Sequence, residues 1–326
     1  MKTMIKLSFA ILCAMMGYSD LNAQNSGDVR LRFSGNDVQI TGDDNDNAVC
    51  VSVMPAGNKS IVQVEGLWGT TVNGKVMVSR AITNLDDMRM DFDSGTNRIY
   101  IDDYVAQTTH GDIIVNGSGL DFVSIKDGLA RKIHVTGATF VTCESIEVED
   151  ECSIFATEHD DTILFDSRNS GGLHVETFDG QDVIDVAGGI YGDVSIISGL
   201  DPTPVRRRGT QTYIGPALLN QTNSDSDDVI LTDLQCYNLT VSTGSGNDRI
   251  DCIDGEYGFW VVGAAQFDGG EGTDFLFLNE IFQRDTGAKQ IWVSIPDRNE
   301  VYDHDNFEFV FGELPDITGP TIVGGW

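Results

Sequence analysis

Apolar and polar residues alternate with a period of two along most of the chain, and this pattern predicts short β-strands. Ile113 and Val115 form one alternating pair, and Leu239 and Val241 form another. Many of the alternating apolar residues are β-branched, which favours strands over helices. No segment keeps a helical apolar period over a dozen residues. We therefore expect an all-β protein.

A second regularity is an Asp or Asn followed, in most cases, by apolar residues two and four positions later. We call these residues anchors, and they are Asn97, Asp121, Asp161, Asp182, Asp228, Asp248 and Asp274. Successive anchors lie about 20 residues apart, or about twice that, which is typical of a repeat protein. On this count the interval from Asp121 to Asp161 holds two repeats. The interval from Asp182 to Asp228 holds two repeats and a short insertion.

Each repeat consists of a strand, a Gly/Asp/Asn turn, a second strand and a second turn. One such unit cannot bury its apolar side alone, whereas stacked units pair each strand with its equivalent about 4.8 Å away. Crossover connections between parallel strands are nearly always right-handed. We predict a right-handed parallel β-helix, which is a solenoid of roughly 20-residue coils, with β-rich caps. An antiparallel sandwich of short strands is the alternative.

The N-terminus has the pattern of an export signal. Lys2 and Lys6 precede the apolar run Leu7–Met16, and Leu21–Ala23 resembles a cleavage site. The apolar run is shorter than the ~20 residues that span a bilayer. We therefore predict a secreted or cell-surface protein without membrane insertion. The net charge of −31 argues against nucleic-acid binding and permits cation binding.

The repeat pattern divides the chain into four predicted segments. These are a signal peptide (1–23), an N-terminal β cap with the first coils (24–87), the parallel β-helix (88–279), and a C-terminal β cap and tail (280–326). A stretch rich in proline, which also contains Arg206–Arg208, predicts a loop insertion at 200–227.

Five cysteines follow the predicted signal. In an oxidising environment Cys143 could pair with Cys152, or Cys236 with Cys252. The odd number of cysteines and their irregular spacing favour the alternative, in which most of them are small core residues.

Several turns carry a sharper motif. Gly269–Phe277 fits the nonapeptide G-G-x-G-x-D-x-U-x in full, Thr243–Asp251 and Asn116–Ser124 lack only the first glycine, and Phe178–Ile184 is a weaker copy. In these turns the chain resembles secreted proteins with haemolysin-type (RTX) calcium-binding repeats, and the acidic exported bacterial β-helix proteins with spaced Gly/Asp turns. The resemblance implies that turn residues hold calcium, and by position these are Asp121, Asp182, Asp248, Asp274, Gly246 and Gly272.

The chain departs from that family in the spacing of its motifs. RTX nonapeptides follow one another directly, whereas here each repeat has one motif, so a shared calcium site would form between stacked coils. In the alternative interpretation, glycine supplies a positive φ and Asp caps the turn in an outward-facing row. Aspartates stacked ~4.8 Å apart repel by roughly 3 kcal/mol at an effective dielectric of 20, which favours a cation. Calcium takes six to eight oxygen ligands with tolerant geometry.

The sequence favours a non-catalytic protein over an enzyme. Acid pairs such as Asp160-Asp161 are expected by chance in so acidic a chain, and His159 beside them is the histidine most worth testing. We predict an extracellular or cell-surface protein that serves adhesion, matrix or surface-layer contacts, with polysaccharide or cell-surface components as partners. The alternative is a carbohydrate-active β-helix enzyme, either a polysaccharide lyase or a hydrolase.

Overall fold

The computed structural model describes residues 27–92, 94–104, 111–190, 192–198, 226–253, 260–261, 264–269, 271–272, 274–278 and 290–294. The predicted signal peptide, Arg206–Arg208 and most of the predicted C-terminal cap lie outside these residues. Every regular element within them is a β-strand, so the predicted all-β class is confirmed. In the part of the chain described here, no helix has the length and apolar character needed to cross a membrane.

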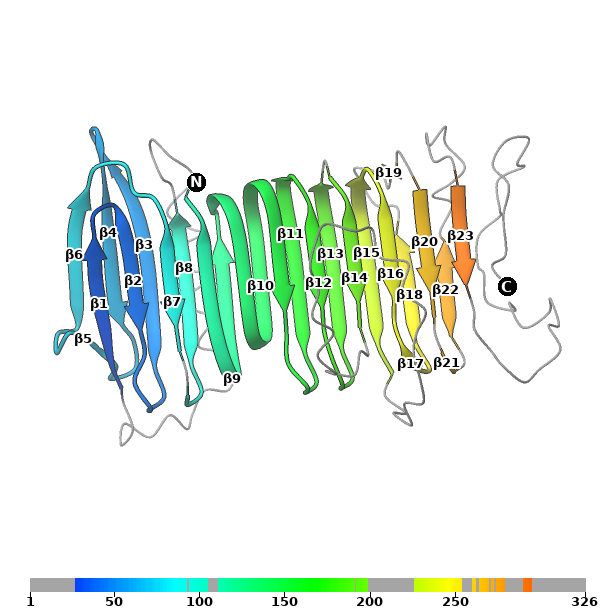
Figure 1. Ribbon diagram of the computed structural model, residues 1–326, viewed down its shortest axis with the longest axis horizontal. Helices are drawn as coiled ribbons and strands as arrows, with labels where there is room; N and C mark the ends of the chain where they lie inside the picture. The colour runs from blue at the N-terminus through cyan, green and yellow to red at the C-terminus, as the bar shows by residue number, and fades with distance from the viewer. Residues whose placement is uncertain are drawn as a thin grey trace, which may run out of the picture.

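The N-terminal strands are paired mainly antiparallel. They are β1 (Asp28–Ser34), β2 (Asp37–Thr41), β3 (Ala48–Ala56), β4 (Lys59–Gly66), β5 (Thr71–Val72) and β6 (Met77–Ile82). Strands β1 and β2 form a hairpin, and β4 pairs with both β3 and β6. Strand β5 pairs with β1 in parallel. These strands occupy one end of the molecule (Figure 1).

The later strands pair in parallel with one another. They are β7 (Met88–Asp91), β8 (Arg98–Tyr104), β9 (Ile113–Lys126), β10 (Leu129–Phe155), β11 (Thr162–Ser170), β12 (Leu173–Glu176), β13 (Val183–Ile190), β14 (Val194–Ile197), β15 (Asp228–Cys236), β16 (Leu239–Ser242), β17 (Ser245–Gly246), β18 (Arg249–Ile253), β19 (Trp260–Val261), β20 (Ala264–Asp268), β21 (Glu271–Gly272), β22 (Phe275–Leu278) and β23 (Gln290–Ser294). In Figure 1 they follow one another along the long axis of the molecule.

Two long parallel ladders organise these strands. Ladder A runs β3–β8–β9–β10–β11–β13–β15–β18–β22. Ladder B runs β2–β7–β9–β10 and continues as β10–β12–β14–β16–β20–β23. The long strands β9 and β10 contribute to both ladders, and β10 curves round the molecule between its two stretches (Figure 1). The sheet as a whole is mixed, because the N-terminal strands join it antiparallel.

The core is built from columns of equivalent apolar residues, as the alternation predicts. One column of ladder A consists of Val49, Ile99, Val123, Val141, Ile163, Ile184, Val229, Ile250 and Leu276, all of them buried. Their neighbours in the chain, such as Leu164 and Val183, face outward and are exposed. Period-two alternation therefore places one side of each strand in a core that is continuous along the stack.

The register corrects two details of the predicted repeat. Ladder A passes directly from β13 to β15, with Val183 opposite Asp228. The interval between their anchors is therefore one step with a long insertion, and the predicted two steps are wrong. In addition, the residue equivalent to the other anchors is Asp227, which precedes β15, and Asp228 is already the exposed first residue of that strand. The two steps predicted between Asp121 and Asp161 are confirmed, because β10 lies between β9 and β11.

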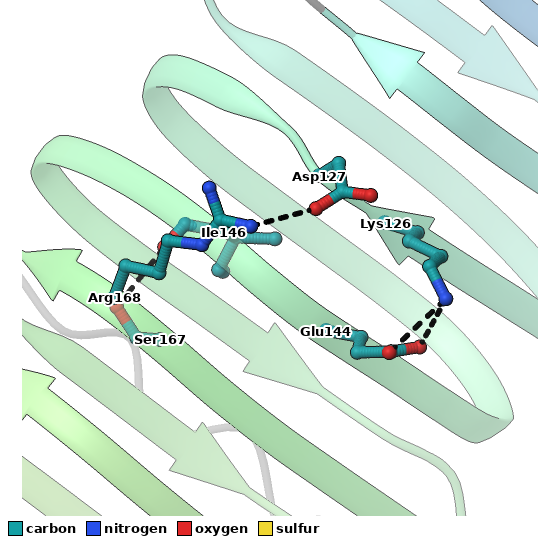
Figure 2. Close-up of polar contacts among 6 residues, drawn as sticks. All are labelled: Lys126, Asp127, Glu144, Ile146, Ser167 and Arg168. Atoms are coloured by element: carbon teal, nitrogen blue, oxygen red, sulfur yellow. Dashed lines mark hydrogen bonds and ion pairs between the residues drawn. The ribbon is translucent and has the colours of Figure 1, made fainter. Parts of the chain in front are cut away.

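Surface ion pairs also link neighbouring rungs of the stack. Figure 2 shows Lys126 on β9 with Glu144 on β10, with 2.9 Å between Nζ and Oε2, and Arg168 on β11 with Asp127, with 3.0 Å between Nη2 and Oδ1. Such exposed pairs contribute about 0–1 kcal/mol each. The core columns and backbone ladders therefore dominate the stability of the stack.

Candidate functional site

Most of the anchor residues, together with Asn47 and with Asp227 in place of Asp228, form a hydrogen-bonded column, which we call the Asn/Asp ladder. Its members are Asn47, Asn97, Asp121, Asp161, Asp182, Asp227, Asp248 and Asp274. The rung of β10 interrupts the ladder between Asp121 and Asp161. In most steps the side-chain Oδ1 of one member accepts the backbone N–H of the member before it, at 3.2 Å (Asn97 from Asn47), 2.8 Å (Asp121 from Asn97), 2.9 Å (Asp182 from Asp161), 2.9 Å (Asp227 from Asp182), 2.9 Å (Asp248 from Asp227) and 3.1 Å (Asp274 from Asp248).

The backbone completes each step of this ladder. The carbonyl of Asp227, for example, accepts the N–H of Arg249, the first residue of β18, at 2.8 Å. At six steps the anchor therefore gives its carbonyl to the next strand and its N–H to the side-chain oxygen of the next anchor. Asp121 is the exception, because Ala138 of β10 lies opposite it and the Asp121 carbonyl accepts the Thr139 hydroxyl. This exchange extends ladder A by one rung into the turn, where the chain would otherwise leave a buried N–H unpaired.

The Asn/Asp ladder faces the interior. Its members from Asn47 to Asp248 are at most 3% exposed, and Asp274 is half-buried. The aspartates accept backbone N–H groups, as the turn-capping alternative predicts. The outward-facing row that this alternative also predicts is wrong, because the aspartates are buried. The period-two pattern explains the inward direction, because each anchor lies two residues before an inward-facing apolar position of ladder A.

The turn glycines leave room for these carboxylates. A Cβ on Gly117 would lie 2.4 Å from Asp121 Oδ2, and a Cβ on Gly269 would lie 2.7 Å from Asp274 Oδ2. In the turn before Asp161, Thr157 takes the glycine's place and donates its N–H and its hydroxyl to the carboxylate, each at 2.8 Å. At Gly117 and Gly269, space for the anchor is thus the reason for glycine.

A second column of oxygen atoms lies beside the Asn/Asp ladder. Thr177, Ser198 and Thr243 each follow a strand of ladder B (β12, β14 and β16), and all three are fully buried. We call them the hydroxyl column. Backbone bonds from Thr177 to Ile197 and from Ser198 to Ser242 place them on successive rungs. Thr177 and Thr243 also lie close enough to Asp182 and Asp248, respectively, to lower the pKa of each carboxyl in part.

Buried oxygen atoms in these two columns lack hydrogen-bond partners among the described residues. They include Oδ2 of Asp121, Asp182 and Asp248 and the hydroxyls of Thr177 and Ser198, which make no hydrogen bond of ordinary geometry although Thr177 lies close to the Asp182 carboxyl. An unsatisfied buried oxygen costs about 1–3 kcal/mol, so this concentration of them calls for a proton or a cation.

Burial raises the pKa values of several carboxyls of the Asn/Asp ladder. Desolvation raises the pKa of Asp161 to about 6, that of Asp248 to about 7 and that of Asp182 to about 8. Neighbouring ladder carboxylates add to the rise at Asp182 and Asp248. The pKa of Asp121 is also raised by burial, although its neighbours in the stack are not acidic. Without a cation, burial and the neighbouring carboxylates therefore favour the protonated form of Asp182 and Asp248 near neutral pH.

The structure brings together part of the predicted calcium-binding set. Gly246 on β17 lies opposite Gly272 on β21, and Asp248 bonds to Asp274 in the same pair of turns. Asp182 lies elsewhere in the stack, between Asp161 and Asp227, and Asp121 lies next to Asn97. The predicted residues therefore belong to one ladder but not to one site.

Sequence reasoning missed the hydroxyl column and the ladder roles of Asn47 and Asp227. A signal for the hydroxyls was present, because Thr177 and Thr243 each stand between an alternating run and the following anchor. A signal for Asp227 was present as well, because the residues two and four positions after it, Val229 and Leu231, are both apolar, whereas Asp228 is followed at the fourth position by Thr232.

The donor set suits a hard cation but is sparse. The described residues contain no group of three or more His, Cys, Asp or Glu side chains placed to hold a metal ion. Two stacked carboxylates and the hydroxyls beside them are the donors available in the interior. Calcium would need turn carbonyls or water to complete its six to eight ligands.

Comparison with known proteins adds no relative: no protein-family model, curated protein sequence or solved structure matches this chain.

Proposed function

We propose that this protein is an exported, non-catalytic, calcium-stabilised β-helix that makes adhesive contacts at the cell surface or in the extracellular matrix. The observation that carries the proposal is the buried column of oxygens around Asp182, where Asp182 Oδ2 and the hydroxyls of Thr177 and Ser198 make no hydrogen bond of ordinary geometry within the described residues, although Thr177 lies close to the Asp182 carboxyl. In this proposal the buried carboxyls, whose pKa values are raised, bind calcium and thereby stabilise the stack.

A right-handed parallel solenoid is the proposed form of the stack. The parallel registers of ladders A and B and the curved path of β10 support it (Figure 1). The right hand is the one expected for parallel crossovers.

Calcium is the proposed ion of the Asn/Asp ladder. Asp182 and Asp227, with Thr177 and Ser198 beside them, would hold one ion. Asp248 and Asp274, in the paired turns of Gly246 and Gly272, would hold another. The ion would supply positive charge to carboxylates that otherwise retain protons, and it would satisfy the remaining oxygens.

Calcium binding is tested by thermal unfolding of the full chain in chelator and in millimolar calcium. We expect a higher Tm in calcium, because an ion that binds the folded state stabilises it by RT ln(1 + [Ca]/Kd). Asp182→Asn should remove part of the gain, whereas Asp228→Asn, an exposed neighbour of the ladder, should keep it. Magnesium should substitute poorly. An identical Tm in chelator and in calcium would refute the calcium proposal.

An aromatic stack offers the proposed contact face. Phe122 and Phe140 stack across ladder A with ring centroids 4.9 Å apart, and Phe122 lies 5.3 Å from the tilted ring of the buried Tyr100. The exposed Trp68 ends the row, edge-on to Tyr100 at 6.0 Å. The Arg98 guanidinium lies 5.3 Å from the centroid of the Trp68 ring. Aromatic residues and arginine are enriched at protein interfaces. Since the protein is strongly acidic, a neutral glycan is the favoured partner.

The adhesion proposal predicts that the protein binds a polysaccharide without cleaving it, whereas the enzyme alternative predicts cleavage. At the predicted histidine, Asp160 accepts the N–H of Gln181 and Asp161 bonds to Thr157, so both acids beside His159 already serve the backbone. We expect binding to a neutral polysaccharide, weakened by Trp68→Ala, without release of reducing ends or unsaturated sugars. Such release, if abolished by His159→Ala or Asp160→Asn, would establish the enzyme instead.

A further inference from the structure

A nearly uncharged strip runs along the outer side of ladder B. It consists of the second and fourth residues of the ladder stretches 113–116, 133–136, 152–155, 173–176, 194–197 and 239–242. These residues are half-buried and alternate with buried core residues. We call them the ladder-B strip. Glu176 is the single Asp, Glu, Lys or Arg in the strip, and its Oε2 lies 3.3 Å from His174 Nε2.

The outer side of ladder A has a different character on the neighbouring strands. Its outward residues from β9 to β18 include six with charged side chains: Lys126, Glu144, Asp166, Asp185, Asp228 and Arg249. The two ladders therefore present different surfaces, one charged and one almost without charge.

An aromatic ring lies within the ladder-B strip, between two imidazole rings. The centroid of Phe155 is 5.5 Å from that of His134 and 5.2 Å from that of His174. Burial lowers the pKa of His134, which keeps this ring uncharged at neutral pH. Hydroxyl side chains occupy much of the remaining strip, at Thr136, Ser153, Ser195, Thr240 and Ser242. An apolar ring with hydroxyls on either side complements a sugar ring, which has apolar C–H faces and a rim of hydroxyl groups.

The dimensions of the strip favour a linear polymer over a second protein molecule. Rungs about 4.8 Å apart make the strip about 24 Å long, and the two outward residues of each strand lie about 7 Å apart. A stable protein interface buries about 800 Å² on each partner, which is far more than so narrow a strip offers. A single polysaccharide chain is long and narrow in the same way.

Charge selects among linear polymers. A polyanion would be repelled by the net charge of −31 and would meet no Lys or Arg side chain in the strip. A polycation would be drawn to acidic residues elsewhere, such as Asp166 and Asp185 on ladder A. An uncharged polymer is the class for which the ladder-B strip is the better of the two surfaces.

We propose that the ladder-B strip binds a neutral linear polysaccharide, with Phe155 stacked against a sugar ring and the serine and threonine hydroxyls bonded to sugar hydroxyls. The inference rests on the proposed adhesive function and adds a second binding surface to the aromatic row that Trp68 ends. With two such surfaces, one molecule would join two polysaccharide chains.

The test is affinity gel electrophoresis of the full-length chain in hydroxyethyl cellulose, in laminarin and in the polyuronate alginate. We expect one of the two neutral polymers to retard the protein and alginate not to do so. The affinity should be the same at low and high salt, because no ion pair forms. Phe155→Ala should weaken binding roughly 3- to 10-fold, the range of a lost aromatic contact. Ser195→Asp, which adds a charge to the strip, should weaken it as well.

Leu164→Ala, on the outer side of ladder A, is the matched control and should bind like the wild type. Unchanged binding by Ser195→Asp and Phe155→Ala would overturn the inference, and Ser195→Asp decides alone if Phe155→Ala does not fold. Binding to alginate, or to neither neutral polymer, would also overturn it. A dimer in sedimentation that Ser195→Asp dissociates would assign the strip to a second copy of the chain instead.

Trp68→Ala separates this inference from the contact face of the proposed function. If Trp68→Ala abolishes binding and the strip variants do not weaken it, the strip has no part and the ladder A face stands. If only the strip variants weaken binding, the ladder-B strip stands and the ladder A face fails. Calcium stabilisation is measured by Tm, so its outcome is independent of both.

Discussion

Asp248 Oδ1 accepts the backbone N–H of Asp227 at 2.9 Å, and the Asp227 carbonyl accepts the N–H of Arg249 at 2.8 Å. These two bonds join the same pair of rungs in opposite directions. The aspartate side chain thus replaces a backbone acceptor at the place where the turn interrupts ladder A. The same relationship recurs along the stack, and it separates two roles of each carboxylate: an acceptor for an N–H, and a buried charge.

Substitution at Asp248 distinguishes these two roles. In chelator near pH 8, Asp248→Ala should lose about 1–3 kcal/mol of unfolding free energy, because the Asp227 N–H loses its acceptor in the core. Asp248→Asn should be at least as stable as the wild type, since an amide oxygen keeps the bond without the charge. Asn97 already plays this part for Asn47. Urea unfolding measures both variants, and an equal loss in both would show that the charge itself is required.

The stability of the calcium-free protein should fall as the pH rises from about 5 to about 8. Ladder carboxyls with pKa values of about 6, 7 and 8 (Asp161, Asp248 and Asp182) lie above the ~3.9 of an unfolded aspartate. The folded state therefore keeps protons that the unfolded chain has lost. The stabilisation from these carboxyls is complete at a pH below the pKa of an unfolded aspartate. It is lost as the pH rises through the pKa values of the folded protein.

The measurement is Tm against pH in chelator. Self-repulsion of the acidic chain also lowers Tm with pH, so Asp182→Asn is the control, and it should flatten the curve. Calcium should also flatten it, because calcium binds the ionised form. A Tm in chelator that rises over this range would contradict the raised pKa values.

Gly117→Ala should destabilise the protein by about 1–3 kcal/mol, the usual cost of overpacking. The new Cβ would lie 2.4 Å from Asp121 Oδ2 and 2.9 Å from the Gly137 carbonyl oxygen. Gly189→Ala is the matched control, since the nearest atom to its Cβ, the Arg168 carbonyl oxygen, is 3.4 Å away. Thermal unfolding compares the two, and a larger loss at Gly189 would overturn the steric argument.

Ile163→Ala should cost about 2–5 kcal/mol, because it removes a fully buried member of a core column. Leu164→Ala, at the next position of β11, should change stability by no more than about 0.5 kcal/mol, since Leu164 is 36% exposed. Denaturant unfolding of the two variants tests which face of β11 is inside. Similar losses in both would mean that the period-two assignment of this strand is wrong.

The sequence alone determined the β class, the inward and outward faces of the strands, and most members of the Asn/Asp ladder. Each of these depends on local chemistry. Period-two alternation decides which side chains are buried together, and an Asp or Asn before an apolar pair marks the start of a strand. Asn97 and Asp248 could be found in this way because each stands directly before a short strand, β8 and β18 respectively.

Only the tertiary structure decided which rungs are neighbours and what the anchors face. The chain between Asp182 and Asp227 has the length of two repeats, yet β13 pairs directly with β15, because backbone pairing and core packing set the register whatever the length of the loop. Likewise, the sequence of a turn motif predicts that its aspartate lies at the surface. Its burial beside Thr177 and Ser198 follows from the stacking of residues distant in the chain, which no local pattern records.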